Sequence, residues 1–285
     1  MDATPIRCIV PSVLSPLLVV LLAASPAPSG ARPLQHDLLV DGAITLTTGA
    51  WWIASETVLK KKLAPRECRL CERGADGSDR RLGFDLLGTR LKLVDPYLDE
   101  MDTASNLLAF AILPAAVFGT HVFAARDNQA LFALPLDALL VAEAMMIAGA
   151  LNQTVKLVAG RSRPFVFRLG QDSPLSEHPE DNNLSFYSGH ASFAFSMVAA
   201  SATIAELRGY RLAKWIWVIG LPLAATMPLM RMAADKHYAT DVLIGSIAGL
   251  AIGILVPRKF HARVGDGIEL SASVSAGGAM VSGQF

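Results

Sequence analysis

Three short polar clusters interrupt an apolar stretch of this chain, and their side chains are of the types that bind and transfer phosphoryl groups. The clusters are Lys156 followed by Arg163-Pro164, then Ser188-Gly189-His190, then Arg231 followed by His237 and Asp241. Lysine and arginine can offset the charge of a phosphate and of its transition state. A Ser-Gly pair at the start of an apolar helix would present backbone N–H groups to an anion. These residue types predict a phosphate-binding active site that draws its positive charge from side chains and holds no metal ion.

The two histidines are suited to different chemical roles. His237 and Asp241 are four residues apart, so on one helical face the carboxylate can accept a hydrogen bond from the imidazole. That contact would fix the tautomer and leave the other ring nitrogen free to attack phosphorus. His190 would protonate the leaving alcohol and then activate water, a task suited to a pKa near neutrality. Each such residue alone is more often a polar cap or a snorkelling cation, so the hypothesis rests on the clusters occurring together.

The clusters lie at the ends of segments that are long and apolar enough to cross a membrane. A spanning helix needs about 20 apolar residues, and the candidate segments are residues 107–125, 131–151, 191–207, 215–230 and 242–256. Residues 38–58 are a weaker candidate because Asp41 and Glu56 interrupt them. Counting crossings from one cluster to the next places all three on the same membrane face. The sequence therefore predicts an all-α fold, an integral-membrane bundle of about six helices with a short C-terminal tail.

Composition supports the membrane class and argues against one class of partner. Hydrophobic residues make up 52% of the 285 residues and charged residues 18%, with a mean hydropathy of +0.41, which leans toward a membrane protein. Lys+Arg and Asp+Glu are balanced at 25 each, and the sequence has neither a basic tail nor a basic stripe interleaved with aromatic residues. We therefore expect the bilayer and a membrane lipid phosphate as partners, and no nucleic acid.

Some residues of the apolar segments are suited to contacts between helices. Gly245, Gly249 and Gly253 recur at four-residue spacing, which lets the backbone of another helix approach closely, so we predict packing there. Asp137 and Glu143 lie inside a span, where an ionisable side chain is either functional or seals a contact between helices. Both interpretations of these two carboxylates stay open.

Polar residues near the first and second clusters also leave alternatives open. Arg161 and Arg168 either assist phosphate binding or serve at the membrane surface. The long loop of residues 165–187 lacks the spacing of metal ligands, and we expect it to form a solvated lid near the mouth of the site. Its ionisable residues are Glu177, His178, Glu180 and Asp181.

The N-terminal part divides into a predicted signal peptide and a connector. Residues 1–31 combine Arg7, an apolar run and a small-residue exit, the order found in a secretory leader. An uncleaved anchor helix is the alternative. Residues 32–104 contain the weaker helix and a polar connector with Cys68 and Cys71. Because structural zinc needs four ligands, these cysteines are expected to be a local disulfide or two free thiols.

The remainder divides into a core and a tail. Residues 105–257 hold the membrane helices and all three clusters, and we assign them as the phosphatase core. Residues 258–285 form the tail, in which apolar and polar residues alternate over residues 268–274 before Gly277-Gly278. Such alternation next to a turn signal predicts a short β-hairpin.

Taken in order, the three clusters resemble the signature of the type 2 phosphatidic acid phosphatase superfamily, to which vanadium haloperoxidases are related. That signature reads Lys-x6-Arg-Pro, Pro-Ser-Gly-His and Ser-Arg-x5-His-x3-Asp, and the resemblance covers roughly residues 105–257. The sequence departs from it at Tyr187, which replaces the proline of the second motif, and at Met230, which replaces the serine of the third. Neither position is assigned to bond-making, so the departures bear on substrate fit more than on mechanism.

The resemblance implies a metal-independent lipid phosphate phosphatase, a phosphoric monoester or diphosphate hydrolase that works through a phosphohistidine intermediate without a cofactor. By resemblance, His237 is the nucleophile, Asp241 orients it and His190 is the acid–base. The residues implied to hold the phosphate are Lys156, Arg163, Ser188, Gly189 and Arg231. The alternatives are a lipid phosphotransferase, a vanadium-dependent haloperoxidase-like enzyme and a non-catalytic lipid-binding membrane protein. Phosphatidic acid, phosphatidylglycerol phosphate, a polyprenyl diphosphate and a lipopolysaccharide phosphate all fit such an anion site.

The membrane face that carries the site can be argued in two ways. The resemblance to bacterial enzymes and the leader place it on the periplasmic side of a bacterial inner membrane. Counting residues 38–58 as a span after a cleaved leader, together with the positive charge of Lys60-Lys61-Lys62, places it in the cytoplasm. We predict the periplasmic face, with residues 38–58 lying along the membrane interface.

Overall fold

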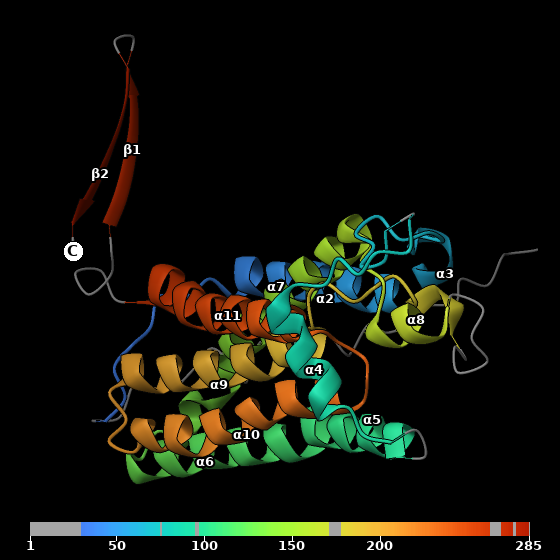
Figure 1. Cartoon of the computed structure of the whole chain (residues 1–285). Helices are drawn as coiled ribbons and strands as arrows, with labels where there is room; N and C mark the ends of the chain where they lie inside the picture. Colours follow the sequence, from blue (N-terminus) through green and yellow to red (C-terminus); the bar gives the residue numbers. More distant parts are fainter. Residues whose placement is uncertain are drawn as a thin grey trace, which may run out of the picture.

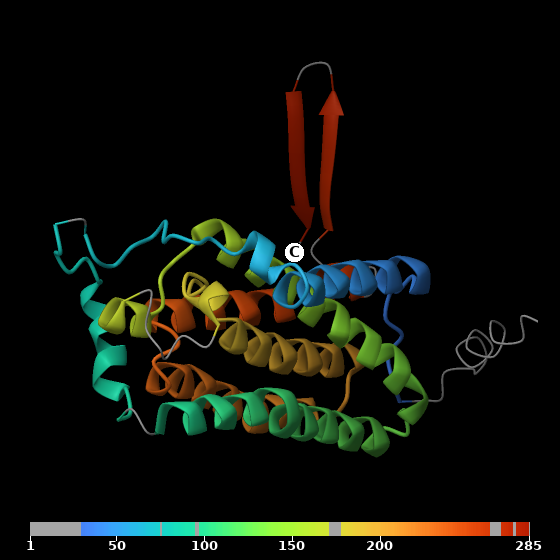
Figure 2. The ribbon, with the colours of Figure 1, turned by 90° about the vertical axis from the view of Figure 1, so that its right-hand side faces the viewer.

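A bundle of long helices forms the body of the protein in its computed structural model (Figures 1 and 2). The structure describes residues 30–74, 76–94, 97–170, 178–262, 269–275 and 278–284. Nearly all of the predicted signal peptide, residues 1–31, lies outside these residues. The long helices are α2 (Leu38–Glu56), α5 (Leu98–Leu107), α6 (Leu113–Asp127), α7 (Leu134–Ala159), α9 (Gly189–Arg208), α10 (Ala213–Ala233) and α11 (Ala239–Val256). The π-helical turn η3 (Leu108–Ile112) joins α5 to α6, so the bundle has six long helical segments within the described residues.

Four of these segments are long and apolar enough to cross a membrane. They are Leu98–Asp127, Leu131–Ala159, Ala213–Ala233 and Ala239–His261, where the second includes η4 (Leu131–Ala133) and the fourth includes η6 (Pro257–His261). The predicted class, an integral-membrane helical bundle, is confirmed.

Helix α9 occupies the middle of the bundle, between α11 on one side and α6 and α10 on the other (Figure 1). Although it was predicted to span the membrane, α9 is not among the four apolar segments in the described part of the chain. Its neighbours shield it from the surroundings, so it carries buried serines, including Ser192, Ser196 and Ser201. A helix enclosed by other helices does not need an apolar face all round.

The glycine ladder of α11 packs directly on α9, as predicted. A Cβ added to Gly245 would lie 2.5 Å from the carbonyl oxygen of Ser188, and one added to Gly253 would lie 2.6 Å from that of Ser196. Side chains at these positions would therefore push the two backbones apart. The glycines allow the closest helix contact in the vicinity of the polar clusters.

Helix α2 packs lengthwise against α7, and the two helices run in the same direction. The indole Nε1 of Trp51 donates to Thr154 Oγ1 at 3.0 Å, and Gly149 leaves room for the ring of Trp52, which a Cβ would approach to 2.7 Å. This packing along a candidate span differs from the arrangement along the membrane interface that we expected for residues 38–58, although α2 is not itself among the four candidate spans in the described residues. Small residues on α2 and on α7, such as Gly49 and Gly149, leave room for large side chains of the other helix, so α2 packs along α7.

The polar connector and the loop after α7 lie at the end of the bundle that holds the three clusters. The connector contains α3 (Lys60–Leu63), η1 (Gly83–Asp85) and α4 (Leu86–Leu91), and the loop after α7 contains α8 (Pro164–Leu169) and η5 (Pro179–Asp181). Arg69 N–H donates to the carbonyl of Gly160 at 2.9 Å, which fixes the connector to the end of α7. Cys68 and Cys71 on either side of this contact form a disulfide, one of the two states that the sequence left open.

The opposite end of the bundle holds the beginning and the end of the described core. Arg32 N–H donates to the carbonyl of Arg208 at 2.8 Å, and Gln35 N–H donates to that of His261 at 3.1 Å. In the tail, β1 (Glu269–Ser275) and β2 (Gly278–Gln284) pair antiparallel.

Candidate active site

The first cluster is arranged by the way in which α7 ends. Gly160 terminates the helix with a left-handed φ of 56°, a conformation that favours glycine. Arg163 then precedes α8, with Pro164 at the first helical position. Lys156 and Arg163 are both buried, and the Lys156 ammonium forms no hydrogen bond or ion pair with any described residue. The turn after α7 thus brings Arg163 into the same region as Lys156. Of these two cations, Lys156 has no hydrogen-bond or ion-pair partner among the described residues.

The second cluster begins α9 beside Lys156. Ser188 caps the helix, its Oγ accepting from Ala191 N–H at 3.5 Å, and its own N–H donates to the carbonyl of Asp241 at 3.0 Å. A Cβ on Gly189 would lie 3.4 Å from Lys156 Nζ and 2.8 Å from an oxygen of Asn152. Glycine therefore lets the first turn of α9 approach the lysine. A helix N-terminus next to a buried cation is suited to binding an anion.

Arg231, in the last turn of α10, brings the third cation. Its Nη1 binds the carboxylate of Asp102 and donates to Ser105 Oγ at 2.7 Å. Its Nε is buried and finds no acceptor among the described residues. A buried guanidinium N–H without an acceptor is rare in proteins, and a phosphate oxygen would satisfy it.

His237 is buried between α10 and α11, before the first residue of α11. Its Nδ1 lies 2.8 Å from the carbonyl oxygen of Ser185. A carbonyl can only accept, so Nδ1 carries a proton and Nε2 carries the lone pair. No described residue forms a hydrogen bond with Nε2. The ring is thus oriented with one nitrogen available as a nucleophile.

The expected hydrogen bond between His237 and Asp241 is not formed. The carboxylate oxygen lies 3.8 Å from Nδ1, while Asp241 accepts instead from Ser185 Oγ at 2.5 Å and from Tyr238 N–H at 3.0 Å. The reason is that α11 begins after His237, so the two residues do not share a helical face. Asp241 occupies the third position of the helix, where its carboxylate folds back on the capping residue.

Arg161 is the main charged partner of Asp241. The guanidinium binds Asp241 at 2.5 Å, Asp85 at 2.8 Å and Glu72 at 2.5 Å, so it joins the connector to the start of α11. Of the two roles considered for Arg161, neither holds in this structure: it is buried, and carboxylates already surround it. Through its ion pair with Asp241, Arg161 holds the start of α11 in place next to His237.

The charges around the histidines favour the neutral form of His237. Burial lowers the pKa of His237 well below 6.5, and the positive charges of Arg163, Arg231 and Lys156 lower it further. The same three cations act on His190, and so does His237. Cations from the first and third clusters therefore lie close enough to act on both histidines.

His190 is half-buried at the start of α9, where its Nε2 lies 2.6 Å from Asn106 Oδ1. The amide oxygen accepts, so Nε2 carries a proton and Nδ1 is left for proton transfer. Asn106 belongs to α5, in a segment that no sequence pattern had connected with the site. It is the partner that orients the second histidine.

Two carboxylates near the cations were also missed as site residues. Asp102 binds Arg231, and Asp181 binds Lys60 at 2.5 Å and lies 3.9 Å from Arg163. Burial raises the pKa of the Asp181 carboxyl, but Arg163 and Lys60 outweigh this effect and lower it to about 2. The available signal was that both lie in polar segments on the membrane face of the clusters. A bound phosphate would compete with these carboxylates for the arginines.

A small cavity of about 100 Å³ opens beside Lys156, Gly189 and His190. Aromatic rings of three different helical segments line its outer part: Trp52, Phe110 and Phe193. The same cavity is thus lined by the polar side chains of Lys156 and His190 and by an apolar, aromatic surface.

Other polar residues considered from the sequence seal contacts within the structure. Asp137 binds Arg208 at 2.7 Å and lies 3.2 Å from His121, at the end of α9 opposite the site. Arg168 pairs with Asp235 at 3.1 Å. The contacts of Asp137 are remote from the cavity, and the Arg168–Asp235 pair is peripheral to it. We interpret both as contacts that stabilise the fold.

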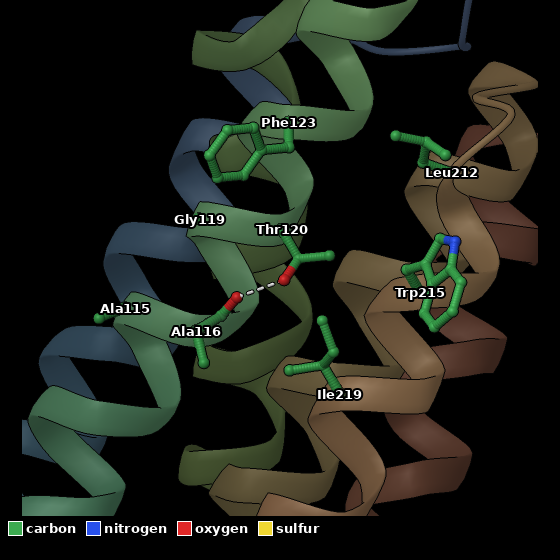
Figure 3. A pocket seen from close by; sticks show the side chains of 8 residues that line it. All are labelled: Ala115, Ala116, Gly119, Thr120, Phe123, Leu212, Trp215 and Ile219. Carbon is green, nitrogen blue, oxygen red and sulfur yellow. Dashed lines mark hydrogen bonds between the residues drawn. The ribbon is translucent and has the colours of Figure 1, made fainter.

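An apolar groove of about 450 Å³ lies between α6 and α10 (Figure 3). Its lining residues are Ala115, Ala116, Gly119, Thr120, Phe123, Leu212, Trp215 and Ile219. The hydroxyl of Thr120 is already bonded to the carbonyl of Ala116 at 2.7 Å. The groove offers no titratable group, whereas Glu56, Lys156 and His190 line the cavity that we take as the candidate active site.

Comparison with known proteins agrees with the motif resemblance. Residues 137–264 match the family model of the PAP2 superfamily, and this range contains all three clusters. The chain is also similar to the crystal structure of a transmembrane PAP2 type phosphatidylglycerolphosphate phosphatase from Bacillus subtilis. That similarity has 19% sequence identity and a TM-score of 0.44, and it covers 76% of this chain and 93% of the other.

Proposed function

We propose that this protein is a lipid phosphate phosphatase that forms a phosphohistidine on His237 and uses no metal ion in catalysis. The observation that carries the proposal is the arrangement of His237: its Nδ1–H is bound by the carbonyl of Ser185 at 2.8 Å, and three buried cations act on its ring. A neutral imidazole nitrogen beside a cationic anion site is suited to attack on phosphorus. The match of residues 137–264 to the PAP2 superfamily supports the same reaction class.

The chemistry follows from these positions in two steps. The phosphate group binds to Lys156, Arg163 and Arg231 and to the N–H groups at the start of α9, which offset its charge. His237 Nε2 attacks phosphorus and the bond to the leaving oxygen breaks, while His190, protonated on both ring nitrogens for this step, donates its Nδ1 proton to that oxygen. His190 then removes a proton from water, which attacks the phosphohistidine and releases inorganic phosphate and free His237. Asp241 positions this apparatus through Arg161, Ser185 and the start of α11.

A lipid substrate is supported by the surroundings of the cavity. Phe110 is 56% exposed, and together with Trp52 and Phe193 it borders the opening beside His190. These rings lie on helical segments of a membrane bundle, so an apolar chain can contact them while the phosphate reaches Lys156. A soluble phosphate ester would leave this apolar surface uncovered.

The test is phosphate release by the purified full chain in detergent micelles, with phosphatidic acid, phosphatidylglycerol phosphate, a polyprenyl diphosphate and a lipopolysaccharide phosphate as substrates. We expect hydrolysis of at least one lipid in excess chelator, inhibition by vanadate, and loss of more than about 10³-fold of the rate in His237→Ala, since removing a nucleophile can cost about 10⁶-fold. His178→Ala is the matched control, because His178 lies on the same end of the bundle with 71% of its side chain exposed. Activity that disappears in chelator and returns with magnesium would contradict the proposal.

The same assay separates the alternative functions. Transfer of the phosphate to a second lipid or a sugar, without release to water, would identify a phosphotransferase. Oxidation of halide by peroxide after addition of vanadate would identify a haloperoxidase-like enzyme. Binding of the lipids without turnover by wild-type protein would identify a lipid-binding protein.

We also propose that the active site faces the periplasm of a bacterial inner membrane. The Cys68–Cys71 disulfide lies at the active-site end of the bundle, next to the contact between Arg69 and Gly160. Disulfides persist in oxidising compartments and are rare in the cytosol, so this location favours the outer face.

A further inference from the structure

Three ionisable side chains from distant parts of the chain meet inside the bundle, away from the candidate active site. They are Asp41 of α2, Glu143 of α7 and His261 at the end of η6, and one ligand atom from each lies within 4.8 Å of the others. Their exposures are 6%, 2% and 1%. Glu143 precedes Lys156 by 13 residues on the same helix, which corresponds to about 20 Å. The cluster is therefore distinct from the phosphate site.

The histidine of this cluster presents a lone pair to a carboxylate. His261 Nδ1 lies 3.1 Å from the carbonyl oxygen of Gln35, so Nδ1 donates and Nε2 of the neutral ring carries the lone pair. That Nε2 lies 3.1 Å from Glu143 Oε2. Two lone pairs at this distance repel each other unless a proton or a cation lies between them. A ring whose other nitrogen donates to a backbone carbonyl is the usual arrangement of a histidine that binds a metal.

Apart from His261, the carboxylates of the cluster have no cationic partner among the described residues. Asp41 accepts from Asp37 N–H at 2.9 Å, and His261 is the one hydrogen-bond or ion-pair partner of the Glu143 carboxylate in the described part of the chain. Asp137, on the same helix as Glu143, is instead neutralised by Arg208 at 2.7 Å. A buried carboxylate without a counter-charge is strongly destabilising. With an uncharged His261 ring, the Asp41–Glu143 pair has no counter-charge among the described residues.

We propose that Asp41, Glu143 and His261 bind one divalent transition-metal ion, such as Zn²⁺ or Mn²⁺. One imidazole and two carboxylates suit such ions, whereas Mg²⁺ and Ca²⁺ prefer all-oxygen sites. Bonds of about 2.0–2.2 Å to one tetrahedral ion place ligand atoms about 3.4 Å apart. His261 Nε2 and Glu143 Oε2 already lie 3.1 Å apart, so the carboxylate of Asp41 is the ligand that would move toward the ion. The ion offsets the two carboxylates, accepts the lone pair of His261 and fastens α2 to α7 and to the end of the last span. Its role is structural and separate from phosphoryl transfer.

The test measures metal content and thermal unfolding of the full chain in detergent. Protein treated with chelator, then dialysed against Zn²⁺ or Mn²⁺ and freed of excess ion, is expected to retain one equivalent and to unfold at a higher temperature than the chelated sample. Co²⁺ should give visible absorption bands typical of nitrogen and oxygen ligands. Glu143→Gln and His261→Gln should weaken binding by more than about tenfold, because even partners outside the ligand set are worth about 10–100-fold.

The controls keep this site apart from other buried carboxylates and from the active site. Asp137→Asn changes a carboxylate of the same helix, and His237→Ala removes the candidate nucleophile, so both should retain one equivalent of metal. Chelator should lower the unfolding temperature of wild-type protein without lowering its initial rate. Natively folded wild-type protein that retains no metal would overturn the proposal and leave a proton shared by the cluster. Metal retained by both ligand variants would overturn it as well.

Discussion

The protonation state of His237 follows from what surrounds its ring. The Ser185 carbonyl accepts from Nδ1, and burial together with the three cations holds the pKa of the ring well below 6.5. A histidine that remains neutral in mildly acidic solution keeps its lone pair for attack on phosphorus. The cations that bind the phosphate thus also keep the nucleophile unprotonated.

This low pKa predicts a loss of stability in acid. The unfolded chain binds a proton at His237 near pH 6.5, but the folded chain binds it only at a lower pH, so stability falls as the pH decreases below 6.5. The slope for one such group is at most about 1.4 kcal/mol per pH unit. Unfolding temperatures at pH 7.5, 6.5 and 5.5 should therefore decrease more in wild-type protein than in His237→Gln. Parallel curves for the two proteins would show that the folded ring titrates normally.

The residue types of the site could be predicted from the sequence, but several of their partners could not. Spacing within one segment connected Asp241 with His237, yet the helix begins between them and the carboxylate contacts Arg161 instead. Asn106 and Asp102 reach the site through packing of α5 on α10, which no local pattern encodes. Contacts between distant segments depend on the fold, so they became visible only in three dimensions.

Among the elements, α9 and α11 set the separation between the two histidines. His190 begins α9, His237 precedes α11, and the glycines of α11 rest on the backbone of α9. Gly249 makes the closest of these approaches, toward the carbonyl of Ser192. The distance between acid–base and nucleophile therefore depends on the absence of a side chain on one helical face.

Gly249→Ala should impair both stability and catalysis. The added methyl group would force α9 and α11 apart, and overpacking of this kind costs about 1–3 kcal/mol. A displacement of about 1 Å at reacting groups can cost about 10²-fold in rate, so kcat/KM should fall by at least tenfold. Gly119→Ala is the matched control, because a Cβ there meets nothing within 4 Å. Equal effects of the two substitutions on unfolding temperature and kcat/KM would contradict this account.

The sequence was informative about helices that face lipid and less so about helices enclosed by protein. Four of the five apolar segments predicted as spans correspond to candidate spans of the structure, and the fifth, residues 191–207, is α9, which other helices enclose. The polar interruptions at Asp41 and Glu56 suggested a helix at the membrane interface, but α2 packs along α7 and its contacts include Trp51 with Thr154. Hydropathy therefore identifies helices that face lipid, but it does not predict where a helix lies when its polar residues face other helices.

For the whole molecule, the direction of α2 determines on which side of the membrane the residues before it lie, relative to the active site. Residues before α2 lie at the end opposite the active site, where Arg32 contacts Arg208 and Gln35 contacts His261. If α2 crosses the membrane with α7, a periplasmic active site places residues 30–37 in the cytoplasm. Cleavage of a secretory leader just before them would place them in the periplasm. If α2 crosses the membrane, the cleaved leader and the periplasmic active site therefore exclude each other, and the disulfide favours the periplasmic site.

Cysteine labelling from outside the cell tests this orientation. Lys61→Cys places a thiol at the active-site end in α3, and Lys214→Cys places one at the opposite end, where α10 begins; both lysines are exposed. In cells with a permeabilised outer membrane, an impermeant maleimide should react with Cys at 61 and leave Cys at 214 unlabelled until the inner membrane is opened. The reverse pattern would place the site in the cytoplasm.

The central claim is that His237 carries the phosphoryl group, and quenched labelling with radioactive phosphate tests it most directly. Wild-type protein mixed with p-nitrophenyl phosphate should give a transient label that is acid-labile and base-stable, and His237→Ala should give none with any substrate. His190→Ala should be nearly inactive on a lipid phosphate, whose alkoxide needs a proton worth about 10²–10⁴-fold. The same variant should still accept the label from p-nitrophenyl phosphate and retain it, because water is no longer activated. Wild-type levels of label in His237→Ala, or a label that is stable in acid and labile in base, would contradict the account.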